Sequence, residues 1–364
     1  PISIRPEPSP NGGRLFERHK NNHNPQYFVF GVSVSWKSKR IRREILFFTW
    51  VLCYNFSLEG CQGPICDQGR ISMRVTLISK GAVAEIDTLG AQLVSYQDVV
   101  NTEYLWQGDP AYWKGQAPIL FPIVGALRNE RAVIGGKAYS MAQHGFARHR
   151  EFTPVITRNE MAVFSLKADE ATKRQYPFDF DLRVTYRLED TRLTVEFLVT
   201  NLSDRPMPFV VGGHPAFRVP VSGEDRFENW VVEFEKEEVI DCPKFLPGSK
   251  LLDFSQTKRI LDHERKLKLT HGLFYDDALI CENTNSRQVK LYSILTGRGV
   301  EMEYGDFRYL GIWSAKNDAP FVALEPWTGC GTAQDEDDCF ERKRGMKLLE
   351  PELSFKAAFT MNIL

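Results

Sequence analysis

The chain has 364 residues, of which 43% are hydrophobic and 26% are charged, a composition that suits a globular protein with a large core and excludes a disordered one. Its formal net charge of −1 provides no basic excess for nucleic acid or an anionic membrane, so we expect a small-molecule partner. The seven cysteines include no CxxC pair and no zinc-type spacing, and their odd number argues against a complete disulfide framework. We therefore expect reduced thiols, a cytoplasmic location, and a monomer or homodimer.

Residues 1–72 differ from the rest of the chain. They contain no methionine and carry ten Lys or Arg against five Asp or Glu, whereas residues 73–364 carry 36 against 42. The first methionine is Met73, and alternating hydrophobicity begins directly after it. We expect 1–72 to be an upstream translation, an artefact or a poorly ordered extension, and 73–364 to be the working domain. The alternative is a targeting segment, because the basic residues 37–43 precede a mostly apolar run at 45–56 that is too short to span a bilayer.

From Met73 onward the dominant hydrophobic period is two, which is typical of strands with one buried face. Residues 182–188 and 193–199 alternate on either side of a turn at 189–192 and predict a hairpin. A third strand at 207–211 follows and is expected to deliver His214 at its end. The other predicted strands, in chain order, are 74–78, 83–86, 92–96, 230–234, 289–294, 300–304, 310–314 and 321–327.

Amphipathic helices and internal repeats are hard to find in this pattern. Many short strands separated by Gly, Pro, Asn and Asp turns over about 290 residues indicate an all-β protein, a large antiparallel β-sandwich.

Two titratable side chains stand in apolar, proline-constrained settings, His214 before Pro215 and Glu325 before Pro326. Proline disfavours helical backbone in the residue before it, so both residues are expected in extended segments or turns. On an extended segment Glu325 shares a face with apolar neighbours, which would remove water from the carboxyl and raise its pKa. A histidine and a glutamate in such places suggest an acid/base pair. The alternatives are a hydrogen-bonded turn histidine and a solvated edge glutamate.

Six short motifs, in order along residues 73–364, resemble the aldose 1-epimerase (galactose mutarotase-like) superfamily, and within it the LacX-type branch. They are Phe-Pro-Ile-Val-Gly at 121–125, Gln-His-Gly-Phe-Ala-Arg at 143–148, Tyr-Pro-Phe at 176–178, Met-Pro-Phe at 207–209, Gly-His-Pro-Ala-Phe at 213–217 and Glu-Pro-Trp-Thr-Gly at 325–329. The resemblance implies a supersandwich of antiparallel strands with a sugar cleft, and interconversion of α and β anomers without a metal or cofactor. Residues 1–72 have no counterpart in it.

The resemblance implies that Glu325 is the general base and His214 the general acid, and we expect neighbouring carboxylates to favour the charged form of His214. Gln143 and His144 are implied as sugar ligands, and Trp327 could stack on the sugar. A core histidine tied to a backbone carbonyl is the alternative for His144. We reject a metal site because His144 and His149 are five residues apart, which does not place two ligands on one helical face.

Two further sugar ligands are implied with an ambiguity each. Asp277 matches a family aspartate that binds a sugar hydroxyl, but Asp276 precedes it, and in a strand that choice changes the face. Arg128 is the candidate for the sugar-contacting arginine, with Arg131 as its competitor. The segment around them departs from the galactose mutarotase pattern, which puts galactose itself in doubt as the substrate.

The substrate can be a neutral sugar or a sugar phosphate. Arg148 follows His-Gly-Phe-Ala as an arginine does in hexose-6-phosphate mutarotases, where it helps hold the phosphate; the alternative is a pairing with a carboxylate at the rim. A non-catalytic carbohydrate-binding protein would use a similar cleft without needing His214 and Glu325 as a pair. A glycoside hydrolase usually needs two carboxylates, and no phosphate-loop motif indicates a nucleotide enzyme.

Overall fold

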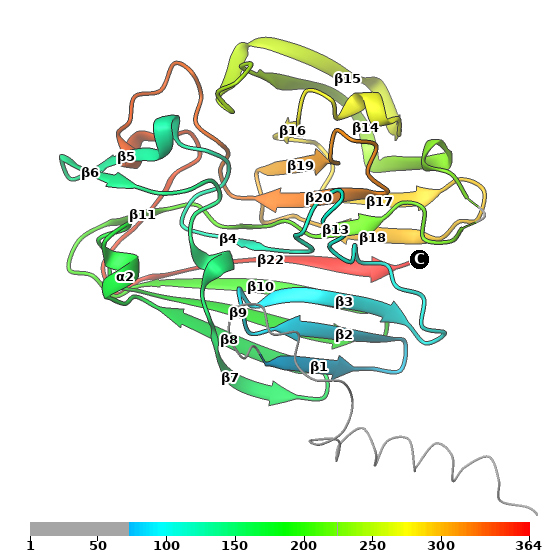
Figure 1. Cartoon of the computed structure of the whole chain (residues 1–364), viewed down its shortest axis with the longest axis horizontal. Coiled ribbons are helices and arrows are strands. Elements are labelled where there is room, and N and C mark those ends of the chain that lie inside the picture. The colour runs from blue at the N-terminus through cyan, green and yellow to red at the C-terminus, as the bar shows by residue number, and fades with distance from the viewer. Residues whose placement is uncertain (1–72, 224) are drawn as a thin grey trace, which may run out of the picture. The chain divides into compact units, whose positions relative to one another are not determined.

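The computed structural model describes residues 73–223 and 225–364, and the expectation for 1–72 lies outside them. This part of the chain consists mostly of strands, and every pair of strands is antiparallel (Figure 1). The predicted all-β sandwich is thereby confirmed. The α-helix of the described residues is the single turn α2, Glu170–Lys173, which begins at Asp169 with a capping box to Thr172. No helix in 73–223 or 225–364 is long and apolar enough to cross a bilayer.

The largest sheet has nine strands in the order β15-β14-β17-β18-β22-β10-β9-β8-β7. The predicted hairpin is its centre, where Leu193 of β10 faces Leu188 of β9. Alternate residues of β10 are buried, as a strand with one face on the core requires. The strands are β7 (Thr153–Arg158), β8 (Met161–Lys167), β9 (Phe180–Glu189), β10 (Arg192–Asn201), β14 (Trp230–Phe245), β15 (Leu252–Lys268), β17 (Gln288–Ser293), β18 (Gly299–Glu303) and β22 (Ser354–Ile363).

Smaller sheets accompany the large one. The six-stranded sheet has the order β16-β19-β20-β12-β4, with β13 paired to β20, and a three-stranded sheet has the order β1-β2-β3. Two further pairs are β5-β6 and β11-β21. Their strands are β1 (Arg74–Ile78), β2 (Ala82–Asp87), β3 (Gln92–Asp98), β4 (Ile119–Leu120), β5 (Arg131–Ile134), β6 (Lys137–Ser140), β11 (Met207–Phe209), β12 (Gly212–Gly213), β13 (Ala216–Arg218), β16 (Leu279–Glu282), β19 (Tyr309–Trp313), β20 (Phe321–Trp327) and β21 (Lys347–Leu349).

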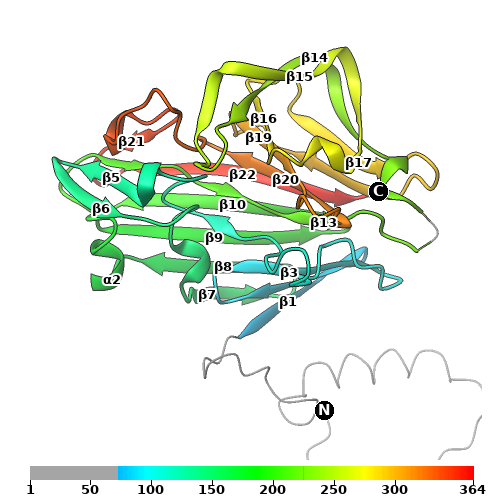
Figure 2. The ribbon, with the colours of Figure 1, turned by 45° about the horizontal axis from the view of Figure 1, so that its top comes forward.

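The core lies between the large sheet and the smaller ones. Tyr186 of β9 donates its hydroxyl to the carbonyl of Ala91, just before β3, at 2.7 Å, and Tyr96 of β3 donates to Met361 of β22 at 3.2 Å. These hydrogen bonds satisfy buried polar groups while they join the two layers. All seven residues of β20 are buried. In Figures 1 and 2, β20 lies between the β14–β15 hairpin and β22, so both of its faces are covered.

The chain near His214 departs from the single strand predicted at 207–211. β11 ends at Phe209 and pairs with β21, and Gly212–Gly213 then form β12, which pairs with β4 and β20. The change of partner brings the residue after β12 to the middle of the six-stranded sheet. β14 also runs far beyond the predicted 230–234, through several irregularities in its pairing with β15.

Candidate functional site

His214 and Glu325 meet at the junction of β12 and β20. The Nε2 atom of His214 lies 3.1 Å from Oε2 of Glu325. β20 carries Glu325 and pairs with β12 through Gly212 and Trp327. The main-chain N–H of His214 donates to the carbonyl of Pro118 at 3.1 Å. Backbone pairing, rather than a flexible loop, therefore sets the distance between the two side chains.

The two glycines before His214 permit this close approach. A Cβ at Gly212 would lie 2.6 Å from Cδ1 of Trp327, and a Cβ at Gly213 would lie 2.8 Å from the ring of Phe359. Contacts this short do not occur between real side chains, so larger residues would push β12 away from its neighbours. The Gly-Gly-His order is a packing requirement of the site.

Both side chains are nearly sealed from solvent, with 8% of the His214 side chain and 2% of the Glu325 side chain exposed. Burial raises the pKa of the Glu325 carboxyl well above its usual value, as expected from the sequence, and the charge of Asp277 raises it further. Burial lowers the pKa of His214 to about 3, and the positive charge of Arg148 acts in the same direction. The expectation that carboxylates would favour charged His214 is wrong, because burial removes the hydration that a charged imidazole needs and no carboxylate among the described residues offsets that loss.

The pKa shifts of the two residues are complementary. Both pKa shifts favour uncharged groups, a carboxylic acid beside a neutral imidazole. Moving the proton from Glu325 to His214 gives a carboxylate and an imidazolium without changing the net charge of the site. The two atoms lie 3.1 Å apart, but Oε2 has no hydrogen-bond partner of good geometry among the described residues.

His144 lies beside His214, with 5.7 Å between the ring centroids and an edge-on arrangement. Its backbone is in the left-handed region, at φ 66°, and is held by a reciprocal contact with Gly125. The His144 N–H donates to the Gly125 carbonyl at 2.9 Å, and the Gly125 N–H donates to Nδ1 of His144 at 3.2 Å. Burial lowers the pKa of His144 well below its usual value, and the charge of His214 lowers it further. The amide nitrogen of Gln143 lies 3.2 Å from Nε2 of His144. The sugar-binding role of these two residues stays a prediction.

Asp277, rather than Asp276, acts electrostatically on Glu325: burial is the main cause of the raised pKa of Glu325, and the charge of Asp277 raises it further. Desolvation raises the pKa of Asp277 itself, while the cations Lys250 and Lys316 lower it. Its φ of 103° is unusual for a residue with a side chain, and strain of this kind gathers at functional sites. The role of Asp277 as a sugar ligand stays a prediction.

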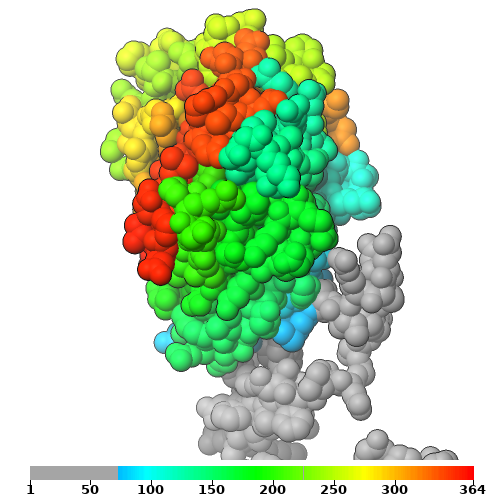
Figure 3. Space-filling model, turned by 90° about the vertical axis from the view of Figure 1, so that its left-hand side faces the viewer, coloured from blue at the N-terminus to red at the C-terminus, as the bar shows by residue number. Residues whose placement is uncertain are grey.

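The three arginines considered as sugar or phosphate ligands have different surroundings in the structure. One guanidinium nitrogen of Arg128 lies within hydrogen-bond distance of the carbonyls of Gln334 and Glu336, at 2.9 and 2.8 Å, and Arg131 lies 3.7 Å from Asp338. Both arginines therefore fasten the segment around β5 to residues 333–338, and Figure 3 shows these chain regions packed side by side. The charge of Arg148, in contrast, lowers the pKa of both His144 and His214.

Trp327 has no exposed ring face on which a sugar could stack. The side chain is buried, and its indole packs so closely on Gly212 and Gly311 that a Cβ at either would lie within 2.7 Å of it. The indole Nε1 is buried without a hydrogen-bond partner of good geometry among the described residues, although its nearness lowers the pKa of Glu325. An N–H donor near a carboxyl group can stabilise its charged form. Stacking on a sugar, the role expected from the sequence, is not supported by this burial.

Sequence reasoning missed three residues beside the predicted ones. The indole of Trp113 stacks on the imidazole of His214, with 4.8 Å between centroids and 23° between planes. Trp313 meets the same imidazole edge-on at 5.5 Å. Lys250, in the turn between β14 and β15, donates from Nζ to Oε1 of Gln143 at 2.7 Å. Trp313 lies in a predicted strand, but no local pattern marks Trp113 or Lys250 as neighbours of His214.

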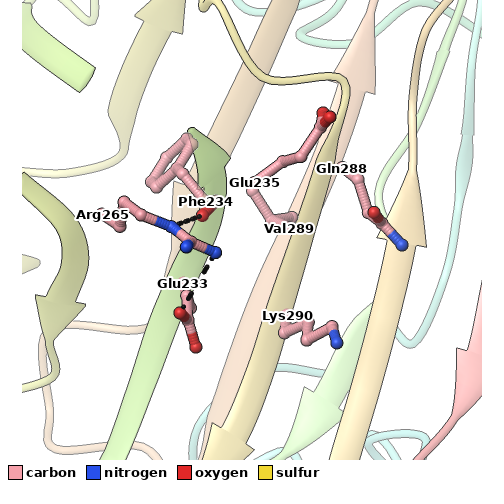
Figure 4. Close-up of a pocket in the computed structure, with 7 residues that line it drawn as sticks. All are labelled: Glu233, Phe234, Glu235, Arg265, Gln288, Val289 and Lys290. Atoms are coloured by element: carbon pink, nitrogen blue, oxygen red, sulfur yellow. Dashed lines mark hydrogen bonds and ion pairs between the residues drawn. The ribbon is translucent and has the colours of Figure 1, made fainter. Parts of the chain in front are cut away.

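A roomier pocket lies elsewhere, between β14, β15 and β17 (Figure 4). Its volume is about 140 Å³, and none of the predicted site residues lines it. Its charges are largely paired, because Arg265 lies 3.4 Å from Glu233 and Lys290 lies 3.3 Å from Glu301. Size therefore does not mark it as the reactive site.

Comparison with known proteins agrees with the fold. Residues 73–344 match the sequence model of the family described as aldose 1-epimerase. The protein LacX (plasmid) of Lactococcus lactis subsp. lactis is 37% identical over 298 residues, which are 80% of this chain and all of that protein. The chain belongs to the aldose 1-epimerase family, whose members are isomerases.

Two solved structures share the architecture. A galactose mutarotase related enzyme from Lactobacillus acidophilus has a TM-score of 0.76 and 32% identity, covering 80% of this chain and 97% of that one. A galactose mutarotase-like protein from Lactobacillus casei has a TM-score of 0.72 and 30% identity, covering 80% and 100%. Membership of the family supports a mutarotase-type activity on a small sugar.

Proposed function

We propose that this protein is an aldose 1-epimerase that interconverts the α and β anomers of an aldohexose by general acid/base catalysis. The 3.1 Å contact between Nε2 of His214 and Oε2 of Glu325, in a site nearly closed to solvent, is the observation that carries the proposal. Acid/base catalysis needs two proton-transfer groups that can act on one substrate at the same time. A buried histidine and glutamate that share a proton meet that need.

The reaction balances with these two groups and no redox step. Glu325, as carboxylate, takes the proton from the anomeric hydroxyl, and His214, as imidazolium, gives a proton to the ring oxygen as the C1–O5 bond breaks. The open-chain aldehyde then rotates about its C1–C2 bond and presents its other face. The ring oxygen attacks C1, its proton returns to His214, and Glu325 returns a proton to the new anomeric hydroxyl.

The spacing of the pair suits this chemistry. The hydroxyl that loses a proton and the ring oxygen that gains one are bonded to the same carbon, so the base and the acid must act close together. Proton transfer needs heavy atoms at hydrogen-bond distance, about 2.6 to 3.2 Å. Groups that already lie 3.1 Å apart can reach the two neighbouring oxygens with small side-chain movements.

The surrounding polar residues support sugar binding at the same place. His144 and Gln143 lie on one side of His214, and Asp277 acts on Glu325 from another. We propose that all three bind sugar hydroxyls, with Trp327 donating its indole N–H near Glu325. Arg148 replaces Arg128 as the proposed arginine of the site, because backbone carbonyls already occupy the guanidinium of Arg128.

A hexose 6-phosphate is the second candidate substrate, favoured by the cations around the pair. Arg148 acts on both histidines, and Lys250 acts on His144 and Asp277. A guanidinium and an ammonium can share one phosphate group, and the planar fork of arginine suits bidentate binding. A neutral sugar would leave these charges without a partner from the substrate.

Anomer-exchange NMR tests the proposal across a panel of aldohexoses and their 6-phosphates. We expect exchange between the α and β signals to accelerate in proportion to protein concentration for at least one sugar. A protein that binds sugars without accelerating exchange would be a carbohydrate-binding protein, and the catalytic proposal would be abandoned. His214→Asn and Glu325→Gln serve as inactive controls.

A further inference from the structure

Among the described residues, no other residue makes a hydrogen bond of good geometry to Nδ1 of the His214 imidazole. Its Nε2 faces Glu325, but its buried Nδ1 has no partner of good geometry in the part of the chain that the structure describes. Catalytic histidines are usually held in one orientation by a carboxylate or carbonyl bonded to the second ring nitrogen. Here no carboxylate or carbonyl of another described residue holds that nitrogen.

Aromatic rings surround the imidazole instead. Trp113 stacks on it at 4.8 Å and 23°, Trp313 meets it edge-on at 5.5 Å, and His144 meets it edge-on at 5.7 Å. A face and two edges restrain both the tilt of the ring and its rotation about χ2. We propose that Trp113, backed by Trp313, is a positioning residue that keeps Nε2 of His214 directed at Glu325. The inference rests on the proposed function of the pair.

The loop around Trp113 is built to hold the indole in place. Trp113 donates its N–H to the carbonyl of Asp109 at 2.9 Å, and its own carbonyl accepts from Nε1 of Trp106 at 2.8 Å. Asn317, after β19, donates to the carbonyl of Ala111 at 2.8 Å and ties the loop to the neighbouring turn. These bonds fix the backbone on both sides of Trp113.

Gly115 is a second, independent indication that the position of the Trp113 indole is fixed. A Cβ at this position would lie 2.3 Å from Cζ2 of Trp113, so only glycine leaves room for the indole where it stacks. The other contacts of the indole are also aromatic, with Trp313 at 5.3 Å and Phe321 at 5.7 Å. The Trp113 side chain is only partly buried, but these rings hold its indole against His214.

Three variants separate positioning from simple packing. Trp113→Leu keeps an apolar side chain without the stacked ring, Trp113→Phe keeps a ring, and Gly115→Ala keeps Trp113 but displaces its indole. Gly305→Ala is the matched control, because a Cβ there meets no atom within 4 Å. Tyr112→Leu is a second control on the same loop, since Tyr112 touches Trp106 and not His214.

We expect Trp113→Leu and Gly115→Ala to lower kcat for anomer exchange by roughly 10- to 100-fold, as a displacement of about 1 Å can. KM should change little, Trp113→Phe should recover most of the rate, and both controls should match the wild type. Water admitted beside His214 should also move the acidic limb of the rate profile to higher pH in the leucine variant. A loss confined to KM would make Trp113 a sugar-binding residue and overturn the proposal, as would wild-type kcat in both variants.

A measurement without substrate keeps this test separate from the proposed function. In the wild-type protein, a stacked indole should shift the ring protons of His214 upfield, and ¹⁵N-labelled histidine should show one ring tautomer. His214→Asn assigns the signals. An unshifted ring that averages between tautomers would overturn the positioning role, even if the protein is an active mutarotase. A shifted, ordered ring in a protein that exchanges no sugar would retain the positioning and remove the catalytic function.

Discussion

Polar side chains lie on strands both at the junction of β12 with β20 and in the outer pocket between β14, β15 and β17. The two places differ in the burial and pairing of their titratable groups. In the outer pocket Arg265 and Lys290 lie beside carboxylates and in contact with water. At the junction His214 and Glu325 are buried, and within the part of the chain that the structure describes each keeps a polar atom without a hydrogen-bond partner of good geometry. The pocket is the larger candidate site, but the junction is the more reactive one. Buried polar groups that lack hydrogen-bond partners are the groups with shifted pKa values.

The largest expected effect comes from the junction itself. His214→Asn and Glu325→Gln should each reduce mutarotation by about 10²- to 10⁴-fold while leaving the fold intact, because each removes one proton-transfer group. Arg265→Ala and Lys290→Ala in the outer pocket are the matched controls and should retain wild-type rates. Exchange rates are measured by NMR, with circular dichroism to verify folding. Near-wild-type exchange in a folded His214 or Glu325 variant would refute the assignment of the pair.

A smaller effect should separate the cations beside the junction from those of the outer pocket. If a 6-phosphate raises kcat/KM over the free sugar, Arg148→Ala and Lys250→Ala should each remove roughly 10- to 100-fold of that advantage, the range for a hydrogen bond to a charged group. Lys290→Ala should not. Kinetics with glucose, galactose and their 6-phosphates decide the matter. An advantage that survives Arg148→Ala would exclude this residue as the phosphate ligand, and no advantage at all would leave a neutral aldose.

The pH dependence of stability distinguishes buried from exposed charges. The pKa of His214 falls from 6.5 to about 3 on folding, so its contribution to the free energy of unfolding is present above pH 6.5 and is lost as the pH falls toward 3. Glu325 behaves oppositely: its contribution is present below its ordinary pKa of 4.5 and is lost as the pH rises through its raised pKa.

Urea unfolding at a series of pH values tests these signs. Between pH 6 and 4, His214→Asn should flatten the acid-induced loss of stability by up to about 1.4 kcal/mol per pH unit. Glu325→Gln should flatten the loss on the alkaline side of pH 4.5 in the same way. Lys290→Ala, at an exposed pair, should leave both slopes unchanged. Parallel curves for the wild type and His214→Asn would show that the imidazole is not buried in solution.

The smallest effect is expected from residues 1–72. The family match begins at residue 73, and the first strand, β1, begins at Arg74. Deleting 1–72 should leave the melting temperature and the exchange rate nearly unchanged. Calorimetry of both forms, beside the exchange assay, measures this. Insolubility or a large drop in melting temperature of the shortened protein would mean that the deletion removes part of the fold.

Sequence reasoning found the parts of the molecule whose local pattern reflects their environment. The β9–β10 hairpin alternates because one face is buried, and Glu325 stands in a run that is apolar because β20 is covered on both faces. β15 escaped detection because most of its residues are exposed, so no alternation marks it.

The missing parts of the site depend on tertiary contacts. Trp113 lies in an irregular loop, and only the meeting of that loop with β12 places it on His214. The prediction for the charge state of His214 was wrong for a related reason. The sequence shows which carboxylates are present, but it does not show how deeply the imidazole is buried, and burial sets its pKa.

The proposed catalysis by the buried side chains of His214 and Glu325 predicts that added salt affects the proton-transfer step and the binding of substrate differently. A buried pair that passes its proton back and forth keeps the same net charge in every step, and dissolved ions hardly screen charges that water does not reach. Added salt should therefore leave the rate at saturating sugar unchanged. Any attraction of a charged substrate to Lys250, in the turn at the edge of the site, acts through solvent and should weaken as salt is added.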